Sequence, residues 1–486
     1  MAGIGLTLRR LVADQTFLGA AAAYFSSGVI SAGPWLISVI SLAILQGTIA
    51  NFLNSYDRQL LFVTITYAFV CSLIITGPIQ IVLTRVVADH IFLREFNAIA
   101  PTFTRTLILS VALLVLIILP FLAWAPFDLP YRLLAASLFV TVALLWLGLS
   151  TISAAQDYVS LMLSFLIGYI FSGGAAVVSG RLFGLVGALA GFTFGQVVCL
   201  ALLINRIYLE FPAGGKLENQ KVTYWAEYWN LALVGCFYYL GQWAEKLFYW
   251  FSPIGIAVQG FYRTFPPYDS SILLAYLMTI PASAVIMVNL ETDFYLHYRA
   301  FFAQVLRKGK SDHRRSSQGT LSEITRARLA MIRAARGGML TLLKLQGLAV
   351  FFTILIAPDL AHLIGLDVNN LTTLRVAILA ASGQAFVLYV VLLLLYLDAR
   401  SQTLLLTLVF AGSNLTLTTL AYLLVPGIYG LGYLFSTILT ALLGMYFLNS
   451  RLTKLDYITF MLQPLEAKRP RGTLTEPPSS KDKVTA

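Results

Sequence analysis

The feature that most constrains this chain is a succession of long apolar runs that contain no Asp, Glu, Lys or Arg. A helix needs roughly 20 apolar residues to cross the ~30 Å hydrocarbon core of a bilayer, and most of the runs reach that length. They cover residues 15–56, 59–84, 106–127, 133–156, 158–180, 182–205, 270–290, 345–358, 376–397 and 401–450. Membrane-spanning strands would need short alternating segments instead, so we interpret the runs as helices.

Three regions complete the count of spans. The run 401–450 is long enough for two spans, and 345–358 reaches full length only if it begins near Gly337. Residues 228–251 form a further apolar stretch that is interrupted only by Glu245-Lys246. The sequence therefore predicts an all-α polytopic transmembrane protein with about twelve helices, arranged as two six-helix halves around a central cavity.

The composition excludes several other classes of protein. Hydrophobic residues make up 58% of the 486 residues and charged residues 11%, against roughly 25% charged residues in a soluble domain. An ordinary soluble enzyme, a disordered chain and a disulfide scaffold are therefore excluded. The formal net charge is +11, but the basic residues lie in loops between apolar runs, so we expect no nucleic-acid partner.

The distribution of Lys and Arg predicts the orientation in the membrane, because cytoplasmic loops carry an excess of both. With the N-terminus inside, 26 of the 33 Lys and Arg residues fall in cytoplasmic segments. The opposite face holds only Arg58, Arg132, Arg181, Arg263 and Arg375. We therefore expect a multi-pass protein with both its N- and C-termini in the cytoplasm.

Changes in polarity divide the chain into two halves and two polar segments. We expect residues 1–205 to form the first six-helix half and residues 206–227 a cytoplasmic linker. The second half is expected over residues 228–450, with a large cytoplasmic loop at 291–336. Residues 451–486 are predicted to form a basic, disordered cytoplasmic tail.

The large loop contains a basic amphipathic stretch. Apolar residues recur at near-helical spacing between 321 and 335, with Arg326, Arg328, Arg333 and Arg336 among or beside them. Such a helix either lies on anionic lipid headgroups beside the ninth span or docks a cytosolic partner. We expect the contact with membrane lipids and keep the partner as the alternative.

Two ionisable residues, Glu245 and Lys246, lie inside the seventh span. A charge at the bilayer centre costs about 2.5–3.5 kcal/mol on insertion scales. Adjacent helix residues point about 100° apart, so we do not expect the two side chains simply to pair with each other. We expect at least one, and Glu245 in particular, to face a water-filled cavity and contact a polar substrate. The alternatives are an ion pair with another helix, or a Lys246 side chain that reaches the headgroups.

The seventh span is also dense in aromatic residues. Trp and Tyr usually mark the ends of a span, but this run continues through the centre. Aromatic faces and Tyr hydroxyls suit sugar rings, whose C–H faces stack while their hydroxyls form hydrogen bonds. We therefore add Gln242, Trp243, Tyr239 and Tyr249 to the candidates that line the cavity. Ordinary helix packing is the alternative.

Glycine and proline residues predict hinges in the first two spans. Gly28, Gly33 and Pro34 interrupt the first span, and Gly77-Pro78 interrupts the second. Proline removes one helical hydrogen bond and kinks the chain. Paired breaks of this kind suit helices that bend during alternating access, and static kinks are the alternative.

The sequence offers little support for catalysis. The four histidines have no metal-ligand spacing, and Lys308-Gly309-Lys310-Ser311 lacks the upstream glycine of a phosphate-binding loop because Gln304 occupies that position. We therefore expect no enzyme activity, no metal and no cofactor.

Several motifs together resemble one known family. They are Gly3-Ile4-Gly5 with Leu8-Arg9-Arg10-Leu11, Ser31-Ala32-Gly33-Pro34-Trp35, Gly77-Pro78-Ile79-Gln80, Pro281-Ala282 and Glu291-Thr292-Asp293-Phe294-Tyr295. In combination they are similar to the PelG family, the inner-membrane transporter subunit of the Pel exopolysaccharide system, within the group of polysaccharide, lipid-linked oligosaccharide and multidrug exporters. The resemblance covers nearly the whole chain.

The resemblance implies a bacterial inner-membrane protein that exports a growing amino-sugar polymer. It also implies partners, namely a cytosolic glycosyltransferase and membrane subunits that sense cyclic di-GMP. One rival function is an ion-coupled antiporter or flippase for small molecules or lipid-linked oligosaccharides. The other is a membrane scaffold that anchors the synthase without transporting anything.

Overall fold

Long apolar helices build the first half of the chain. The structure is a computed structural model that describes residues 17–211, 223–310, 317–363 and 370–461. The elements of this half are α2 (Phe17–Ile49), α3 (Ser55–Leu93), the short 3₁₀ helix η1 (Phe96–Ala98), α4 (Ile99–Trp124), α5 (Leu129–Ala154) and α6 (Tyr158–Glu210).

Helix α6 is two antiparallel spans joined by a break. Phe183 and Gly184 leave the helical conformation, and Gly184 has a φ of +61° that favours glycine. After the break the chain returns along its first arm, and a Cβ at Gly187, Gly191 or Gly195 would overlap the opposite backbone. The glycine spacing thus allows the two arms to pack closely.

The second half adds a hairpin and a set of longer helices. Its elements are α7 (Thr223–Glu227), α8 (Trp229–Phe251), β1 (Ile256–Gln259), β2 (Tyr262–Thr264), α9 (Pro266–Leu277), α10 (Ile280–Val288), the π-helix η2 (Asn289–Phe294), α11 (Tyr295–Lys310), α12 (Ser317–Leu355), α13 (Ala357–Leu363), α14 (Leu371–Tyr396), α15 (Arg400–Leu424), α16 (Leu431–Thr453) and α17 (Leu455–Met461). Strands β1 and β2 pair antiparallel.

The described residues confirm the predicted class of fold. Ten helices are long and apolar enough to cross a membrane. Counting α6 as its two arms, and adding the more polar α8 with its 23 residues, gives the expected twelve spans. The chain is an all-α polytopic membrane protein, and the short β1–β2 hairpin is an addition that the sequence analysis did not anticipate.

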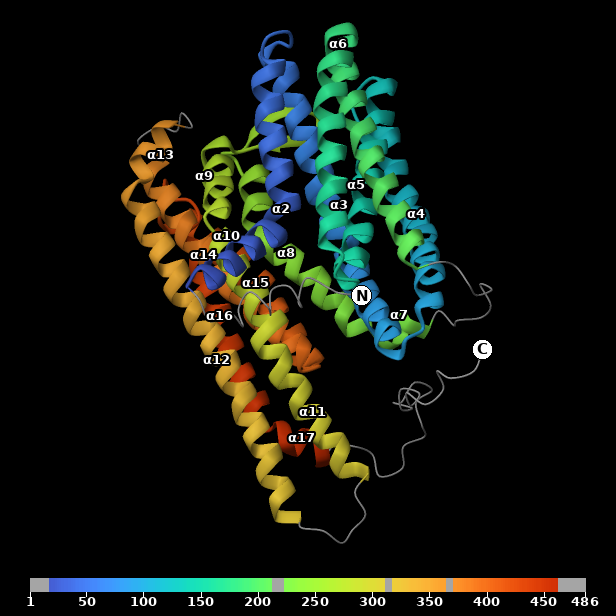
Figure 1. Ribbon diagram of the computed structural model, residues 1–486. Coiled ribbons are helices and arrows are strands. Elements are labelled where there is room, and N and C mark those ends of the chain that lie inside the picture. Colours follow the sequence, from blue (N-terminus) through green and yellow to red (C-terminus); the bar gives the residue numbers. More distant parts are fainter. Residues whose placement is uncertain (1–16, 212–222, 311–316, 364–369, 462–486) are drawn as a thin grey trace.

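The bundle has two distinct ends (Figure 1). At one end, which we call the stalk end, α11, α12 and α17 project beyond the other helices. The opposite, hairpin end carries the β1–β2 hairpin. Three of the five basic residues assigned to the non-cytoplasmic face lie near the hairpin. Arg263 is in β2, Arg132 lines a cavity together with Gln259, and Arg58 is two residues from Tyr56, which bonds to Gln259.

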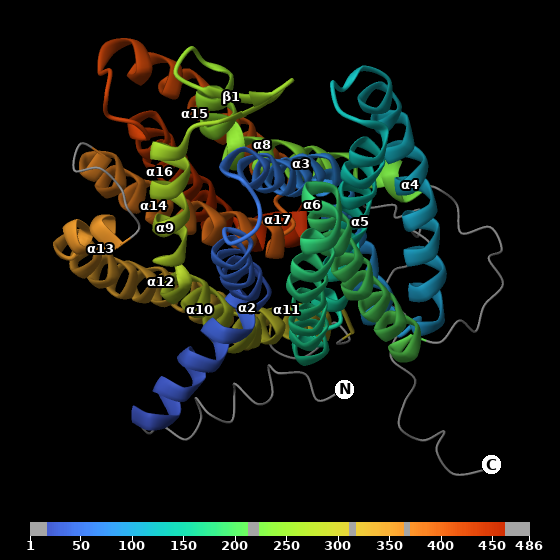
Figure 2. The ribbon, with the colours of Figure 1, turned by 90° about the horizontal axis from the view of Figure 1, so that it is seen from above.

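The two halves meet along two pairs of helices, α2 with α10 and α3 with α8, which lie near the middle of the bundle in the view from above (Figure 2). In the first pair Gly28 faces the Ala284 methyl group, and Ser31 bonds to Ser283 with 3.0 Å between the hydroxyl oxygens. In the second pair Gly77 faces Gly235, and a Cβ at Gly235 would overlap the Gly77 carbonyl. Small residues therefore allow the halves to approach closely.

The hinge candidates do not interrupt their helices in this conformation. Helix α2 continues through Pro34 and α3 through Pro78, although α2 changes direction along its length (Figure 1). Both spans are therefore continuous helices at these residues. Gly28 and Gly77 form contacts between the halves, and Gly33 packs against Met162. That they act as hinges stays a proposal.

The basic stretch of the large loop is the continuation of a span. Helix α12 has 39 residues, about 58 Å at 1.5 Å per residue. Residues 337–355 alone cover about 28 Å, close to the hydrocarbon thickness. The expectation of a separate helix lying beside the ninth span is therefore wrong, because the arginines extend the axis of that span.

The polar segments are also partly helical. Helix α6 continues to Glu210, inside the expected linker, and α16 and α17 carry the chain to Met461, inside the expected tail. The rest of the predicted tail, most of the linker and the motif at 3–11 lie outside the described residues.

The glycine contact between α3 and α8 gives a first prediction. Gly235→Ala should lower the melting temperature, because the new methyl group overlaps the Gly77 carbonyl and overpacking costs about 1–3 kcal/mol. The matched control is Gly412→Ala, where nothing lies within 4 Å of the added carbon; it should leave the melting temperature unchanged or raise it. Thermal unfolding in detergent measures both, and equal melting temperatures would show that the halves do not depend on this contact.

Candidate functional site

Glu245 and Lys246 form an ion pair inside the membrane-spanning region. The Lys246 Nζ lies 2.7 Å from the Glu245 Oε1 and also donates to the carbonyl of Gln242, at 3.1 Å. The expectation that adjacent side chains could not pair is wrong. The long lysine side chain bends back over the preceding turn of α8, toward the residue four positions earlier, and this brings its ammonium beside the glutamate.

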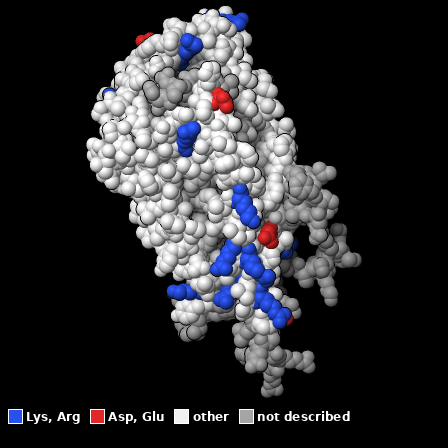
Figure 3. Space-filling view, turned by 90° about the vertical axis from the view of Figure 1, so that its left-hand side faces the viewer, with Lys and Arg blue, Asp and Glu red and all other residues white. Residues whose placement is uncertain are grey.

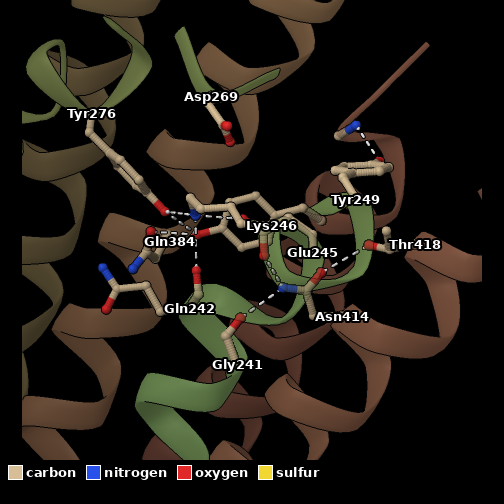
Figure 4. A network of polar contacts seen from close by, with 12 residues as sticks. Gly241, Gln242, Glu245, Lys246, Tyr249, Asp269, Tyr276, Gln384, Asn414 and Thr418 are labelled. Carbon is tan, nitrogen blue, oxygen red and sulfur yellow. Dashed lines mark hydrogen bonds and ion pairs between the residues drawn. The ribbon is translucent and has the colours of Figure 1, made fainter. Parts of the chain in front are cut away.

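The second carboxylate oxygen of Glu245 has its own partner (Figure 4). The Asn414 amide donates to Oε2 at 2.6 Å and to the carbonyl of Gly241 at 2.7 Å. The Thr418 hydroxyl in turn donates to the Asn414 carbonyl oxygen at 3.1 Å. Helix α15 thus fixes the orientation of the carboxylate, and both glutamate oxygens are hydrogen-bonded.

Three aromatic rings surround the ammonium of Lys246. Its Nζ lies 4.7 Å from the ring centroid of Trp243, 5.0 Å from that of Tyr276 and 5.6 Å from that of Tyr433. The Tyr276 hydroxyl accepts a hydrogen bond from Nζ at 3.2 Å, and Tyr433 continues the network by donating to Gln384. Ring faces attract a cation, so the charge of Lys246 is stabilised by rings and by the carboxylate together.

The pair lies in the interior of the second half. The side chains of Glu245 and Lys246 are 0% and 4% exposed, and their partners come from α8, α9, α15 and α16. The sequence analysis placed the pair beside a wet cavity between the halves, and in this conformation it instead packs against protein. That either residue lines a passage in another conformation stays a proposal.

The other cavity candidates occupy different surroundings. Tyr249 is buried, and its hydroxyl accepts from the Gly430 amide at 2.9 Å. Tyr239 lies at the contact between the halves, where its hydroxyl is 3.3 Å from the Gln80 amide oxygen. Trp243 and Gln242 are half-buried, and the indole N–H of Trp243 has no hydrogen-bond partner within the described residues.

The ion pair is connected to the hairpin through Trp250, one turn further along α8. The Trp250 indole N–H donates to the Asp269 carboxylate, which also accepts from the Thr264 hydroxyl and the Phe265 amide, both at 2.9 Å. Trp250 also stacks on Tyr67 of the first half, with centroids 4.9 Å apart. Asp269 therefore fixes the end of β2 to the same tryptophan that contacts the other half.

The hairpin joins the two halves at its end of the bundle. The Tyr67 hydroxyl donates to the Arg263 carbonyl at 3.0 Å and accepts from the Arg263 amide at 3.1 Å. Gln259 bonds to Tyr56 and to the carbonyl of Pro126. Rings of the hairpin also pack edge-on against rings of the first half, as Phe261 does against Phe121.

The stalk end is bridged as well. The Tyr228 hydroxyl donates to the Asp89 carboxylate at 2.8 Å, and the Gln156 amide donates to the Glu291 carboxylate at 3.0 Å. Both bonds join the first half to the second. Nearby, burial raises the pKa of the Asp157 carboxyl, but hydrogen bonds from Arg206 and Ser160 outweigh burial and hold that pKa below its usual value.

The arginines of the basic stretch gather on the stalk. Arg326, Arg333 and Arg336 are exposed, whereas Arg328 bonds to the carbonyl of Thr453. Basic side chains outnumber acidic ones on this side of the stalk end (Figure 3).

The sequence analysis missed most partners of the site. Tyr276, Asn414 and Tyr433 lie on three helices far from α8 in sequence, and their meeting depends on the packing of the bundle. The hairpin had a weak signal, since Gly260 between Gln259 and Phe261 marks a turn between two short apolar segments. Within the described residues, no group of three or more His, Cys, Asp or Glu could hold a metal ion.

The fold defines a class of protein: a multi-pass, all-α membrane protein. The profile of the family described as "PelG: Putative exopolysaccharide Exporter (EPS-E)" matches residues 1–460. The chain therefore belongs to the PelG family, and this family and the fold together indicate a transporter.

Solved structures show the same fold at low sequence identity. A multidrug-resistance MATE transporter of the MOP superfamily, in an outward-facing conformation, is 14% identical with a TM-score of 0.64, over 90% of this chain and 96% of that one. A MOP-superfamily transporter from Pyrococcus furiosus, described by the reverse polarity of its binding pocket, is also 14% identical with a TM-score of 0.64, over 89% and 96%. The comparison with curated proteins found no match.

The ion pair gives a second prediction. Lys246→Met or Glu245→Gln alone leaves one buried charge without its partner and should destabilise the protein by about 3–5 kcal/mol. The double variant removes both charges and should recover most of that loss. Melting temperatures of the four proteins in detergent test this. If the double variant loses as much stability as the two single variants lose in sum, the two side chains are not coupled.

Proposed function

We propose that the protein exports an exopolysaccharide across the bacterial inner membrane, with its stalk end in the cytoplasm. The observation that carries this proposal is the pattern of contacts between the halves. They are bridged at the stalk end by Tyr228–Asp89 and Gln156–Glu291, and at the hairpin end by Gln259 and Tyr67. A transporter that alternates access must release one set of bridges at a time. The stalk-end set is polar, and the hairpin set combines hydrogen bonds with ring contacts.

A polymer would pass between the halves, along α3 and α8. Tyr239 already lies there, and the half-buried Trp243 offers an indole N–H without a partner in the described chain. An aromatic face with a free donor suits a sugar ring. Separation of α3 from α8 would bring further residues of α8 to the passage, with Gln242 and the Glu245–Lys246 pair as candidates.

The stalk suits a cytosolic partner. Arg326, Arg333 and Arg336 extend the axis of a span beyond the hydrocarbon core, and Arg326 lies about 16 Å along the helix from Gly337. At that distance from the hydrocarbon core, the Arg326 side chain is better placed to bind an acidic protein surface than lipid headgroups. A glycosyltransferase that hands its growing product to the stalk end would couple polymerisation to export, and membrane subunits that sense cyclic di-GMP would complete the Pel-like system.

The main rival is an ion-coupled antiporter of small molecules or lipid-linked oligosaccharides. It needs a carboxylate that takes up and releases an ion during transport. Glu245 is already paired with Lys246 and Asn414, and the acidic residues of the first half lie near helix ends, as Asp57, Asp128 and Asp157 do. Export driven by polymerisation is therefore the better-supported function.

The hairpin gives a third prediction and tests transport directly. A Cβ at Gly260 would lie 2.6 Å from the Cγ of Pro126, so the changes Gly260→Cys and Pro126→Cys place two thiol side chains side by side, and we expect them to form a disulfide on oxidation. In inverted vesicles that contain the protein and its synthase, we expect oxidation to reduce the polymer protected in the lumen at least tenfold and reduction to restore it.

The control is the same double variant in its reduced form, because Gly260 has a φ of +60° and a Gly260→Cys change is strained whether or not the disulfide forms. The single variant Pro126→Cys, oxidised in the same way, should transport normally. Undiminished export by the cross-linked protein would reject an opening at the hairpin and favour the scaffold. Export by the protein alone under a proton gradient, without polymerisation, would favour the antiporter.

The stalk gives a fourth prediction. Reversing Arg326, Arg333 and Arg336 to Glu should reduce export severalfold without lowering the melting temperature, because all three side chains are exposed. Arg375→Glu, an exposed arginine at the hairpin end, is the matched control. Normal export by the triple variant would show that these arginines dock no partner needed for transport.

A further inference from the structure

A cavity of about 380 Å³ opens at the hairpin end, beside the tip of the hairpin. Most of its wall belongs to the first half, including Phe127, Asp128, Tyr131 and Arg132, and Gln259 closes it from the second half. Small-ligand pockets enclose roughly 300–1,000 Å³ and combine apolar or aromatic walls with a few polar groups. This cavity meets both criteria.

The Gln259 side chain lies at the edge of the cavity and forms two hydrogen bonds there that a ligand could form in its place. Its amide oxygen accepts from the Tyr56 hydroxyl at 3.0 Å, and its amide nitrogen donates to the carbonyl of Pro126 at 3.2 Å. One carboxamide from the second half thus satisfies a donor and an acceptor of the first half. When the hairpin withdraws, both groups lose their partner.

Two further polar groups at the cavity are unused. The Asp128 side chain is exposed, and no hydrogen bond or ion pair joins its carboxylate to the described residues. The Nε of Arg132 is buried and has no hydrogen-bond partner among them, although its Nη1 donates to the carbonyl of Leu122 at 2.6 Å. A hydroxylated ligand could bond to both groups.

We propose that this cavity is a binding subsite for an N-acetylated amino-sugar unit, whose place Gln259 holds when the hairpin is closed. An acetamido group carries a carbonyl oxygen and an N–H on one carbon, as the glutamine carboxamide does, so it can accept from Tyr56 and donate to Pro126. The sugar ring then lies against Phe127 and Tyr131, with hydroxyls toward Asp128 and Arg132. The inference rests on the proposed function and assigns a place on this chain where the substrate binds.

This arrangement makes hairpin closure and sugar binding competitive. A sugar unit enters only when Gln259 leaves, and Gln259 returns only when the unit has been released. The subsite therefore belongs to the last stage of export, on the side away from the cytoplasm.

The test is a binding measurement on the full chain in lipid nanodiscs. The probes are a tetramer of N-acetylglucosamine and, for comparison, a tetramer of glucose, which lacks the acetamido group. Gln259→Ala removes the internal competitor and should tighten binding of the acetylated probe about tenfold, whereas Tyr56→Phe should weaken it about five- to tenfold, the effect of one hydrogen bond. The controls Gln59→Ala and Tyr446→Phe, both at exposed positions, should bind as the wild type does.

Three results would overturn the subsite: equal binding of the two probes, no binding to Gln259→Ala, or affinities that neither Gln259→Ala nor Tyr56→Phe changes. The proposed function fails separately, in the vesicle assay. Normal export together with any of these binding results rejects the subsite and leaves export standing. Specific binding without export keeps the site and rejects the transport role.

Discussion

A buried carboxylate and a buried ammonium can stay charged within a membrane span only if their polar atoms form hydrogen bonds or ion pairs. The Glu245–Lys246 pair meets this requirement with groups from four helices, α8, α9, α15 and α16. Burial of the pair therefore dictates where these helices lie relative to one another. The cost of leaving either charge alone, several kcal/mol, makes the arrangement of the second half cooperative.

Helix α8 also connects the ion pair to the hairpin and to the first half. One turn after Lys246, Trp250 contacts Asp269 and Tyr67, and through them the hairpin and the first half. A shift of α8 along the α3 contact cannot leave the hairpin unchanged, because both depend on the same tryptophan. The interior of the second half is in this way linked to the bridge at the hairpin end.

Much of the fold followed from the sequence because bilayer thickness sets the length of a span. Charge-free runs located the spans, and Gly184 and Gly430, both with positive φ, lie at the starts of the sixth and twelfth spans. The site followed only in part. Glu245 and Lys246 were recognisable as charges in an apolar run, but Asn414 and Tyr276 are ordinary residues until packing brings them to the pair. The prediction that Glu245 and Lys246 would not pair was wrong, because the angle between adjacent Cβ atoms does not determine where the end of a long lysine side chain lies.

The continuity of α12 has a mechanical meaning. A straight rod of 39 residues begins in the stalk and reaches α13 at the opposite face (Figure 1). A sideways push on its stalk end, together with α11 that packs against it, tilts the rod about its contacts in the membrane, so that the opposite end moves the other way. Docking of a partner on one side of the bilayer can thus move residues on the other side, although no ligand crosses the membrane.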